Sequence, residues 1–587
     1  MRWLVILSAA ALVLIAIGPY VLPMFMVNSL IRGFLYAAVA LTVDILWGYT
    51  GILTFGQSAF FGIGAYAAGL IFTHMGFSTE HAFLAFGAGI VVAMAIAAIV
   101  GWLSFYHGAS PLYASVVSLV LPIVVAQLLY SGGQFTGSSS GLSGFESFDV
   151  SIEAWFWITG AFLVALTAAA WIFVRSDAGR VLVAIRENEA RCEYLGVNVS
   201  RIKILLLVVC AAIAAIAGYA FAGVQMVVAP EYAGFVFGTE LIIWVALGGR
   251  GTLLGPVIGT LIIDLGTAYL SGNLPFVWKL IIGFAFVIVI VALPQGLMPI
   301  LTRPFRRTQA QMDASVPVLQ AVAAEPFAGL SGGGQYALDI QDVRKHFGSL
   351  KVLEGIRFRA QRGELLSLVG PNGAGKTTLM RCIADGGERS GGSVLINDHD
   401  IGKRTPYECV AYGVGRKFQT ANVFETLTVA EAVRIARTRL QRPQFTGRAE
   451  TLEVPPAVVK VMQATGLDQQ LATEARYLSH GQKQALELAM VLALEPSVVL
   501  LDEPTAGLTK PERALIGQIL TDLTAKEGLC ILLVEHDLDF VREISSRVIV
   551  LHLGQIVLDG TVAEVVNSEL VRTIYAGGGT LDSVEVH

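Results

Sequence analysis

The sequence carries little charge for its length. Of its 587 residues, 14% are charged and 55% are hydrophobic, whereas a typical soluble domain is about 25% charged. This composition excludes a disordered or fibrous chain and argues against a wholly soluble one. The formal net charge of −5 is small for a chain of this size, so no overall field for binding nucleic acid is indicated. The length corresponds to three or four domains.

Cysteines are also few, and they are widely separated. No CxxC pair and no Cys/His cluster occurs, so the pattern supports neither a disulfide framework nor a zinc site. We expect five unpaired, buried thiols, at Cys192, Cys210, Cys382, Cys409 and Cys530.

Lysine and arginine are absent between Arg32 and Arg175. Residues 1–307 hold only 25 of the 85 charged residues, although they make up more than half of the chain. This half is suited to lipid, and the rest has the charge density of a soluble domain. We predict eight to ten membrane-spanning helices, with apolar runs near residues 3–25, 30–48, 58–75, 82–105, 113–131, 154–174, 203–223, 253–271 and 277–300.

The distribution of positive charge predicts the orientation of these spans. Six basic residues crowd between positions 175 and 203, and three more follow the last apolar run at 303–307. The positive-inside tendency places both segments in the cytoplasm. The first apolar run follows Arg2 like a signal peptide, but no small-residue cleavage site follows it, so we expect a retained helix.

The strongest local motif is GPNGAGKTT, which matches GxxxxGK[ST] and follows the apolar run LLSLV. In such a strand–loop–helix unit, backbone N–H groups and the helix N-terminus surround phosphate oxygens. We expect the lysine to reach the β- and γ-phosphates of ATP and the following threonine to bind Mg²⁺. The predicted nucleotide-binding residues are Gly370, Pro371, Asn372, Gly373, Ala374, Gly375, Lys376, Thr377 and Thr378.

A second apolar strand, VVLLDEP, ends in two carboxylates. Asp502 at the strand tip suits Mg²⁺ ligation, and Glu503 is placed to polarise the attacking water. The predicted fold class is a polytopic α-helical membrane domain followed by an α/β P-loop ATPase domain. The predicted boundaries are a transmembrane domain at 1–302, a flexible linker at 303–335, an ATP-binding domain at 336–576 and a tail at 577–587.

The second half resembles the ATPases of ABC transporters, beginning with the segment LSHGQ at 478–482. The resemblance implies an adenine-stacking aromatic at Phe347, a Q-loop glutamine at Gln419 that also serves Mg²⁺, and a catalytic switch histidine at His536 beside Glu503. It also implies that Ser479, Gly481 and Gln482 contact the ATP bound by an opposite ATPase subunit, so hydrolysis requires a second ATPase domain. His480 and Thr509 depart from the usual family residues, and neither change removes a phosphate-contacting group.

The first half, over residues 35–300, resembles LivM-type permeases of branched-chain amino acid importers, and the ATPase half resembles LivG. The segments that carry the resemblance lie at 48–70, 136–144, 179–203 and 244–259. The chain therefore looks like a fusion of two usually separate proteins. The resemblance identifies 179–203 as a coupling helix that docks on an ATPase domain near the Q-loop.

Several features of the membrane half have two interpretations. The carboxylates Asp44, Glu240 and Asp264 lie in or near apolar runs, where they serve translocation or only pair with neighbouring helices. The glycines at 62, 64 and 69, and those at 251, 255 and 259, allow close helix packing, while interrupted helices often lie near substrate paths.

The resemblance implies an ATP-hydrolysing importer subunit in the bacterial inner membrane, multi-pass, with a cytoplasmic ATPase. Branched-chain amino acids are the leading substrate, and urea or a short amide is the alternative, because GRKFQ, LSHGQKQ and WVALGGRGT look closer to urea-type members. Expected partners are a LivH-like permease, a LivF-like ATPase or a second copy of this chain, a periplasmic solute-binding protein and membrane lipid. An ABC exporter and a membrane-anchored regulatory ATPase are rival classes. Eight or more spans of bilayer length argue against the exporter.

Overall fold

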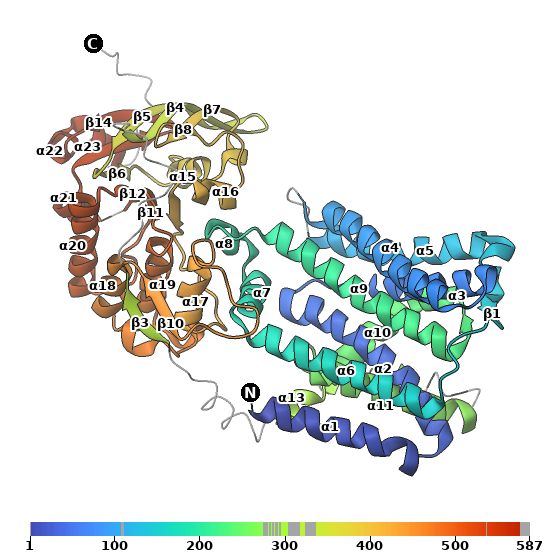
Figure 1. Cartoon of the computed structure of the whole chain (residues 1–587). Coiled ribbons are helices and arrows are strands. Elements are labelled where there is room, and N and C mark those ends of the chain that lie inside the picture. Colours follow the sequence, from blue (N-terminus) through green and yellow to red (C-terminus); the bar gives the residue numbers. More distant parts are fainter. Residues whose placement is uncertain are drawn as a thin grey trace. The chain divides into compact units, whose positions relative to one another are not determined.

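The computed structural model describes residues 2–106, 111–273, 277, 280, 283–284, 287, 291–292, 295–302, 317–322, 336–535 and 537–575. The chain forms two compact units (Figure 1). The first comprises Met1–Arg186, Val199–Asp313 and Phe445–Gly447, and the second comprises Glu187–Asn198, Ala314–Gln444 and Arg448–His587.

The first unit is a bundle of helices. Its main helices are α1 (Arg2–Val21), α2 (Met24–Asp44), α3 (Gln57–Met75), α4 (Thr79–Phe105), α5 (Pro111–Ser131), α6 (Ile152–Arg175), α7 (Asp177–Glu187), α9 (Val199–Gln225), α10 (Phe235–Gly248) and α11 (Leu254–Asn273). A π-helical turn, η1 (Ile45–Tyr49), continues α2. The short elements are η2 (Gly133–Phe135), η3 (Ser138–Ser140), β1 (Leu142–Ser143), β2 (Val227–Val228), η4 (Pro230–Ala233) and α13 (Met298–Thr302).

Within the described residues, seven helices are long and apolar enough to cross a membrane: α1, α2 with η1, α3, α4, α5, α6 and α9. These correspond to the first seven predicted apolar runs. The predicted run at 253–271 is the shorter apolar helix α11, and α10 is a further short apolar helix that the sequence analysis did not separate. Most of the predicted run at 277–300 lies outside the described residues.

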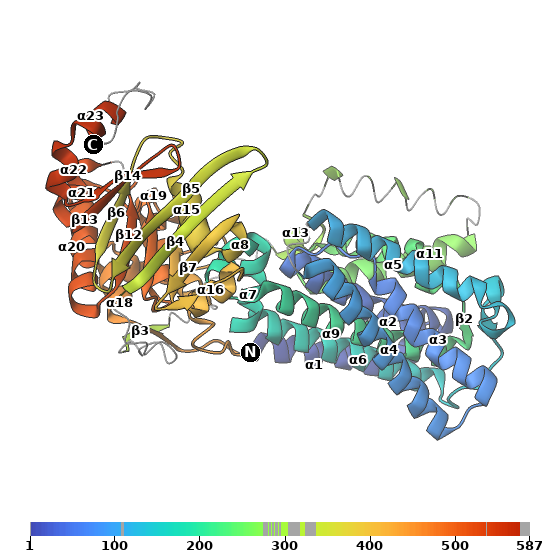
Figure 2. The same ribbon diagram turned by 90° about the horizontal axis from the view of Figure 1, so that it is seen from above.

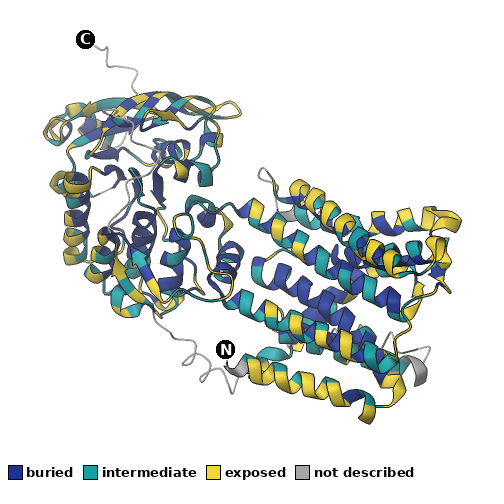
Figure 3. Ribbon diagram, viewed as in Figure 1, coloured by how far each residue is buried: buried dark blue, intermediate teal, exposed yellow. Residues whose placement is uncertain are grey.

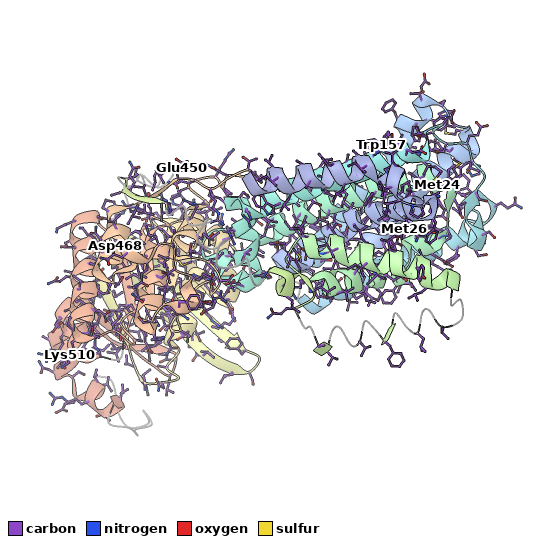
Figure 4. The ribbon with its side chains drawn as sticks, turned by 90° about the horizontal axis from the view of Figure 1, so that it is seen from below. Met24, Met26, Trp157, Glu450, Asp468 and Lys510 are labelled. Atoms are coloured by element: carbon purple, nitrogen blue, oxygen red, sulfur yellow. The ribbon has the colours of Figure 1, made fainter. Side chains whose placement is uncertain are left out.

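Burial separates central from peripheral helices in this unit. Helix α2 is almost entirely buried, whereas α1 is almost entirely exposed (Figure 3). Tyr36 of α2 lies within an aromatic cluster with Phe61, Phe221, Phe237 and Trp244. Apolar side chains such as Met24, Met26 and Trp157 are exposed on the bundle surface (Figure 4), as expected for helices whose solvent is lipid.

Small residues bring α3 and α9 into close contact. A Cβ atom added at Gly64 would lie 2.0 Å from the carbonyl oxygen of Ala215, and one added at Gly218 would lie 1.9 Å from that of Phe61. Any larger residue would force the helices apart, so these glycines serve packing. Gly259 likewise faces the Trp244 carbonyl between α11 and α10. The packing interpretation is therefore confirmed at Gly64 and Gly259.

The second unit is an α/β domain with two large sheets (Figure 2). The six-stranded sheet has the order β14–β13–β6–β12–β11–β9, parallel except for β14. Its strands are β6 (Leu365–Val369), β9 (Val414–Lys417), β11 (Val498–Asp502), β12 (Cys530–Val534), β13 (Arg547–His552) and β14 (Gln555–Gly560). The four-stranded antiparallel sheet contains β4 (Tyr336–Phe347), β5 (Leu350–Gln361), β7 (Gly391–Ile396) and β8 (His399–Asp400).

Helices surround these sheets. They are α8 (Glu189–Tyr194), α15 (Lys376–Ala384), α16 (Pro406–Ala411), α17 (Val429–Arg437), α18 (Pro456–Ala464), α19 (His480–Leu492), α20 (Lys510–Glu527), α21 (Leu538–Ile544), α22 (Val562–Asn567) and α23 (Glu569–Tyr575). Single 3-10 turns are η6 (Gly386–Glu388), η7 (Leu467–Gln470) and η8 (Ala475–Tyr477). Strands β6, β11 and β12 are buried along their whole length, which explains their continuous apolar sequences.

Part of the segment 303–335, which the sequence analysis describes as a flexible linker, belongs to a small parallel sheet. Within that segment, β3 (Val318–Ala321) pairs in parallel with β10 (Thr451–Val454). The Val318 N–H donates to Glu450 O at 2.9 Å, and the Val322 N–H donates to Val454 O at 3.0 Å. These backbone bonds attach part of the linker to the second unit. The sequence analysis missed them because a four-residue strand without a buried face has no periodic signal.

Candidate functional site

Four neighbouring parallel strands end at one edge of the six-stranded sheet. The spatial order of these strands is β6, β12, β11 and β9. Strand β6 leads to the glycine-rich loop and β12 leads to Glu535, whereas β11 ends at Asp502 and β9 ends just before Gln419. Crevices at the carboxyl ends of such strands are where α/β proteins bind ligands. The sheet order therefore brings together residues that are more than 100 positions apart in sequence.

The glycine-rich loop has the predicted strand–loop–helix form. It leaves β6 at Val369, and α15 begins at Lys376. Gly373 has a φ of +82° and Gly375 has a φ of +103°, which side-chain-bearing residues adopt only with strain. Lys376 Nζ donates to Gly370 O at 2.6 Å and to Pro371 O at 3.0 Å, so the ammonium lies against the loop. Loop amides, helix N-terminus and ammonium together form a cradle for phosphate.

The predicted metal ligands Thr377 and Asp502 lie side by side. Thr377 Oγ1 donates to Asp502 Oδ2 at 3.2 Å, next to the phosphate cradle. Burial raises the pKa of the Asp502 carboxyl and lowers that of the Lys376 ammonium, and the charges of Asp502 and Glu503 oppose the second shift. A hydroxyl–carboxylate pair with Asp502 buried and Thr377 exposed beside a phosphate cradle fits Mg²⁺, which takes oxygen ligands from one or two protein groups and from phosphates.

Glu503 and Gln419 also meet. Gln419 Nε2 donates to Glu503 Oε1 at 2.8 Å, so the predicted Q-loop glutamine contacts the predicted catalytic carboxylate. Glu503 has a φ of +47°, an uncommon conformation for glutamate, and its N–H donates to Val534 O at 2.8 Å. Backbone strain of this kind persists only where neighbouring structure holds it, and it clusters at functional sites.

The other predicted nucleotide contacts lie at separate places on the second unit. Ser479 caps α19, accepting a hydrogen bond from Gln482 N while Gln482 Oε1 accepts one from Ser479 N. Gly481 packs near Leu508, at the end of the loop between β11 and α20. Phe347 ends β4 with its ring half exposed, and Lys345 Nζ lies 4.6 Å from the ring centre. His536 lies outside the described residues.

Residues 187–198 belong to the second unit, although the chain reaches them between two membrane helices. Arg191 is fully buried there: its Nη1 lies 3.2 Å from Glu487 Oε1 and donates to Arg416 O at 3.0 Å. Glu187 accepts a hydrogen bond from Thr426 N at 3.2 Å, and Asn188 donates to Asn422. The segment thus contacts residues on both sides of Gln419.

Sequence reasoning missed Arg191 and Glu487. The segment reads as a helix of mixed charge, which is usually a solvated surface, and nothing local marks one arginine as buried. The one available signal is that Glu487 lies among the apolar residues of α19, where a buried acid requires a partner.

The membrane carboxylates Asp44 and Asp264 pair with neighbouring segments of the first unit. Asp44 is fully buried and accepts hydrogen bonds from Gly251 N at 2.5 Å and Leu253 N at 3.1 Å. Asp264 on α11 forms an ion pair with Arg32 on α2 at 3.0 Å. Glu240 lies on α10. Pairing with a neighbouring helix or turn therefore describes Asp44 and Asp264.

Comparison with known proteins identifies both halves. Residues 25–291 match the family described as "Branched-chain amino acid transport system / permease component", and residues 353–506 match the family "ABC transporter". The ATP-binding protein LivG of Escherichia coli (strain K12), named for high-affinity branched-chain amino acid transport, is 29% identical over 41% of this chain and 98% of its own length. The histidine transport ATP-binding protein HisP of Pseudomonas aeruginosa is 33% identical over 41% of this chain and 98% of its own length.

A solved ATP-binding cassette of an ABC transporter in its ADP conformation aligns with a TM-score of 0.36 and 25% identity, over 42% of this chain and all of that one. The chain belongs to the ABC transporter family and joins a permease domain of the branched-chain amino acid transport type to an ABC ATPase. The predicted resemblance and fold class are confirmed. The protein is an ATP hydrolase whose reaction is coupled to transport, and it is a membrane protein with its ATPase in the cytoplasm.

Proposed function

We propose that this chain is the fused permease–ATPase subunit of an importer that carries branched-chain amino acids across the bacterial inner membrane. The observation that carries the proposal is the match of residues 25–291 to the permease family of that transport system, in one chain with an assembled ATPase site. The relatives LivG and BraF are both named for branched-chain amino acid transport, which supports the same substrate.

In the proposed mechanism, the loop Gly370–Thr378 and Lys376 bind the phosphates of ATP, and Phe347 stacks on the adenine. Thr377 and Asp502 would hold Mg²⁺, with Gln419 contributing if it turned from Glu503, and the bound ion would supply charge neutralisation for the phosphates. Glu503 accepts a proton from the water whose oxygen attacks the γ-phosphorus, and ADP leaves. His536 contacts the γ-phosphate.

The site is completed by a second ATPase domain. The segment of that domain equivalent to LSHGQ covers the ATP bound here, and Ser479, Gly481 and Gln482 cover the ATP bound by the second domain. We infer that residues 179–203 act as the coupling helix, a role supported by the contacts of Arg191 and Glu187 in the second unit. Closure of the ATPase pair would then move this segment and reorient the membrane helices.

The proposed partners are a LivH-like permease, a LivF-like ATPase or a second copy of the chain, and a periplasmic solute-binding protein. The proposed domains are 1–302, 336–576 and a tail at 577–587, with the linker at 303–335 anchored by β3.

Uptake of labelled leucine and labelled urea by proteoliposomes containing the assembled complex, ATP and the binding protein tests the proposal. We expect leucine uptake that depends on the binding protein and is lost in Glu503→Gln. Uptake of urea but not leucine would overturn the substrate, and ATP-driven efflux without any binding protein would overturn import itself.

A further inference from the structure

A buried carboxylate joins two distant parts of the membrane unit. Asp44 ends α2, and its two oxygens accept hydrogen bonds from Gly251 N and Leu253 N, which lie in the turn between α10 and α11. These bonds place a negative charge at the N-terminus of α11, where the helix dipole favours it. Asp44 therefore fixes where α11 begins relative to α2.

The π-helical turn η1 approaches the same segment closely. Tyr49 Oη donates to Gly251 O at 2.9 Å. A Cβ atom added at Gly48 would lie only 2.6 Å from Gly251 N, so the two backbones touch. Turns of π-helix are rare and are frequently found at functional sites. The contact thus involves an uncommon backbone turn.

The turn itself is held in an unfavourable conformation. Leu253 has a φ of +58°, which is a genuine outlier for a large branched side chain. Strain of this kind persists only where neighbours hold it. The bond from Leu253 N to Asp44 is one such restraint.

One arginine connects this cluster to the segment of the second unit. Arg186 Nη1 donates to Gly48 O at 2.5 Å. The next residue, Glu187, begins the segment 187–198 and accepts the hydrogen bond from Thr426 N. Arg186 and Glu187 are consecutive residues of α7, so the arginine that binds the Gly48 carbonyl is joined covalently to that segment. Arg250, in the turn between α10 and α11, has its guanidinium carbon 5.0 Å from the ring centre of Trp47 in η1. This is a second contact between the turn and η1.

We propose that Asp44 is a positioning residue for transport: with η1 it forms a latch that holds the α10–α11 turn in the resting state and releases it when ATP draws the segment 187–198. The proposal rests on the proposed function. In the latched state Asp44 bonds Gly251 N and Leu253 N. In the released state Arg186 leaves Gly48 O, η1 rearranges, and the two amides open to water. A static brace would keep the same bonds throughout the cycle.

Hydrogen exchange of a chain whose latch residues are unchanged distinguishes a latch from a brace. The sample is the assembled complex in nanodiscs, compared without nucleotide and with ATP trapped by Glu503→Gln. We expect the peptide covering 249–253 to exchange at least tenfold faster with ATP, while peptides in the middle of α9 stay unchanged. Equal protection of 249–253 in both states would overturn the proposal. No variant of the latch is needed, so misfolding cannot obscure the result.

Variants add a functional readout. Asp44→Asn keeps the shape of the side chain but has one strong acceptor fewer. We expect the backbone amides of 249–253 in this variant to exchange fast in both states. It should lower the leucine carried per ATP several-fold while hydrolysis continues. Asp264→Asn, at the other paired membrane carboxylate, is the matched control and should leave exchange at 249–253 unchanged. Full coupling in Asp44→Asn would overturn the proposal. Absence of binding-protein-stimulated hydrolysis in the wild type would instead refute the proposed function.

Discussion

Arg191 Nη1 lies 3.2 Å from Glu487 Oε1, and neither side chain is exposed to solvent. The same carboxylate accepts hydrogen bonds from Phe418 N at 3.0 Å and Asn422 N at 3.3 Å, on either side of Gln419. Glu487 thereby fixes the Q-loop backbone, and Arg191 supplies its counter-charge. Burial lowers the pKa of Arg191, and Glu487 opposes that shift. The conformation of the Q-loop thus depends on residue 191 being in place.

Removing one member of this pair leaves a buried charge without its partner. We expect Arg191→Met to destabilise the second unit by about 3 kcal/mol, because broken buried pairs typically cost 3–5 kcal/mol, and Lys417 nearby retains part of the compensation. The double variant Arg191→Met/Glu487→Gln should recover much of the loss. Chemical denaturation of the four members of the cycle measures the coupling.

The exposed pair Lys526–Asp522 is the control for that cycle, since both side chains are about half exposed or more. Its disruption should change stability by no more than about 0.5 kcal/mol. A coupling energy for Arg191 and Glu487 as small as that of the control would contradict a role for the pair in holding the Q-loop.

Glu503→Gln should abolish hydrolysis while preserving ATP binding. The amide keeps the size of the side chain and can still pair with Gln419, but it cannot accept the proton of the attacking water. General-base catalysis contributes about 100-fold or more, so we expect a loss of at least that factor in steady-state phosphate release. Glu512→Gln, at the start of α20, is the control. Turnover at the wild-type rate would show that another group is the base.

The Thr377 hydroxyl should set the Mg²⁺ requirement. Thr377→Val keeps the shape but loses the hydroxyl that lies beside Asp502, so we expect the Mg²⁺ concentration for half-maximal hydrolysis to rise at least tenfold. Thr377→Ser restores a hydroxyl and should return the Mg²⁺ concentration for half-maximal hydrolysis to the wild-type value. Hydrolysis measured against Mg²⁺ at fixed ATP tests this, and an unchanged midpoint in Thr377→Val would remove Thr377 from the metal site.

The β3–β10 pairing should protect the linker from proteases. Val322→Pro removes the N–H that donates to Val454 O, so we expect cleavage near residues 317–322 to become several-fold faster in limited proteolysis. Glu450→Gln, which keeps every backbone donor and acceptor, is the control. Equal cleavage rates in the variant and the wild type would show that β3 does not restrain the linker.

The ATPase motifs were predictable because each is local. The apolar run before Gly370 and the glycines themselves specify a strand, a turn and a helix, and the run before Asp502 specifies a buried strand. Their assembly was not local: the hydrogen bond between Gln419 and Glu503 exists because β9 and β11 are neighbours in the sheet. Sequence order contains no statement of that adjacency, and the family resemblance supplied it.

The sequence by itself determined the two solvents of the chain, most membrane helices and the phosphate-binding loop, because hydrophobic periodicity and glycine-rich turns act over a few residues. Only the tertiary structure decided which polar groups are buried together: Asp44 with the turn at 251–253, Arg191 with Glu487, and β3 with β10. These partners lie more than 100 residues apart, and a buried polar group is stable only where the folded backbone brings it a partner. That requirement has no signature in a local stretch of sequence.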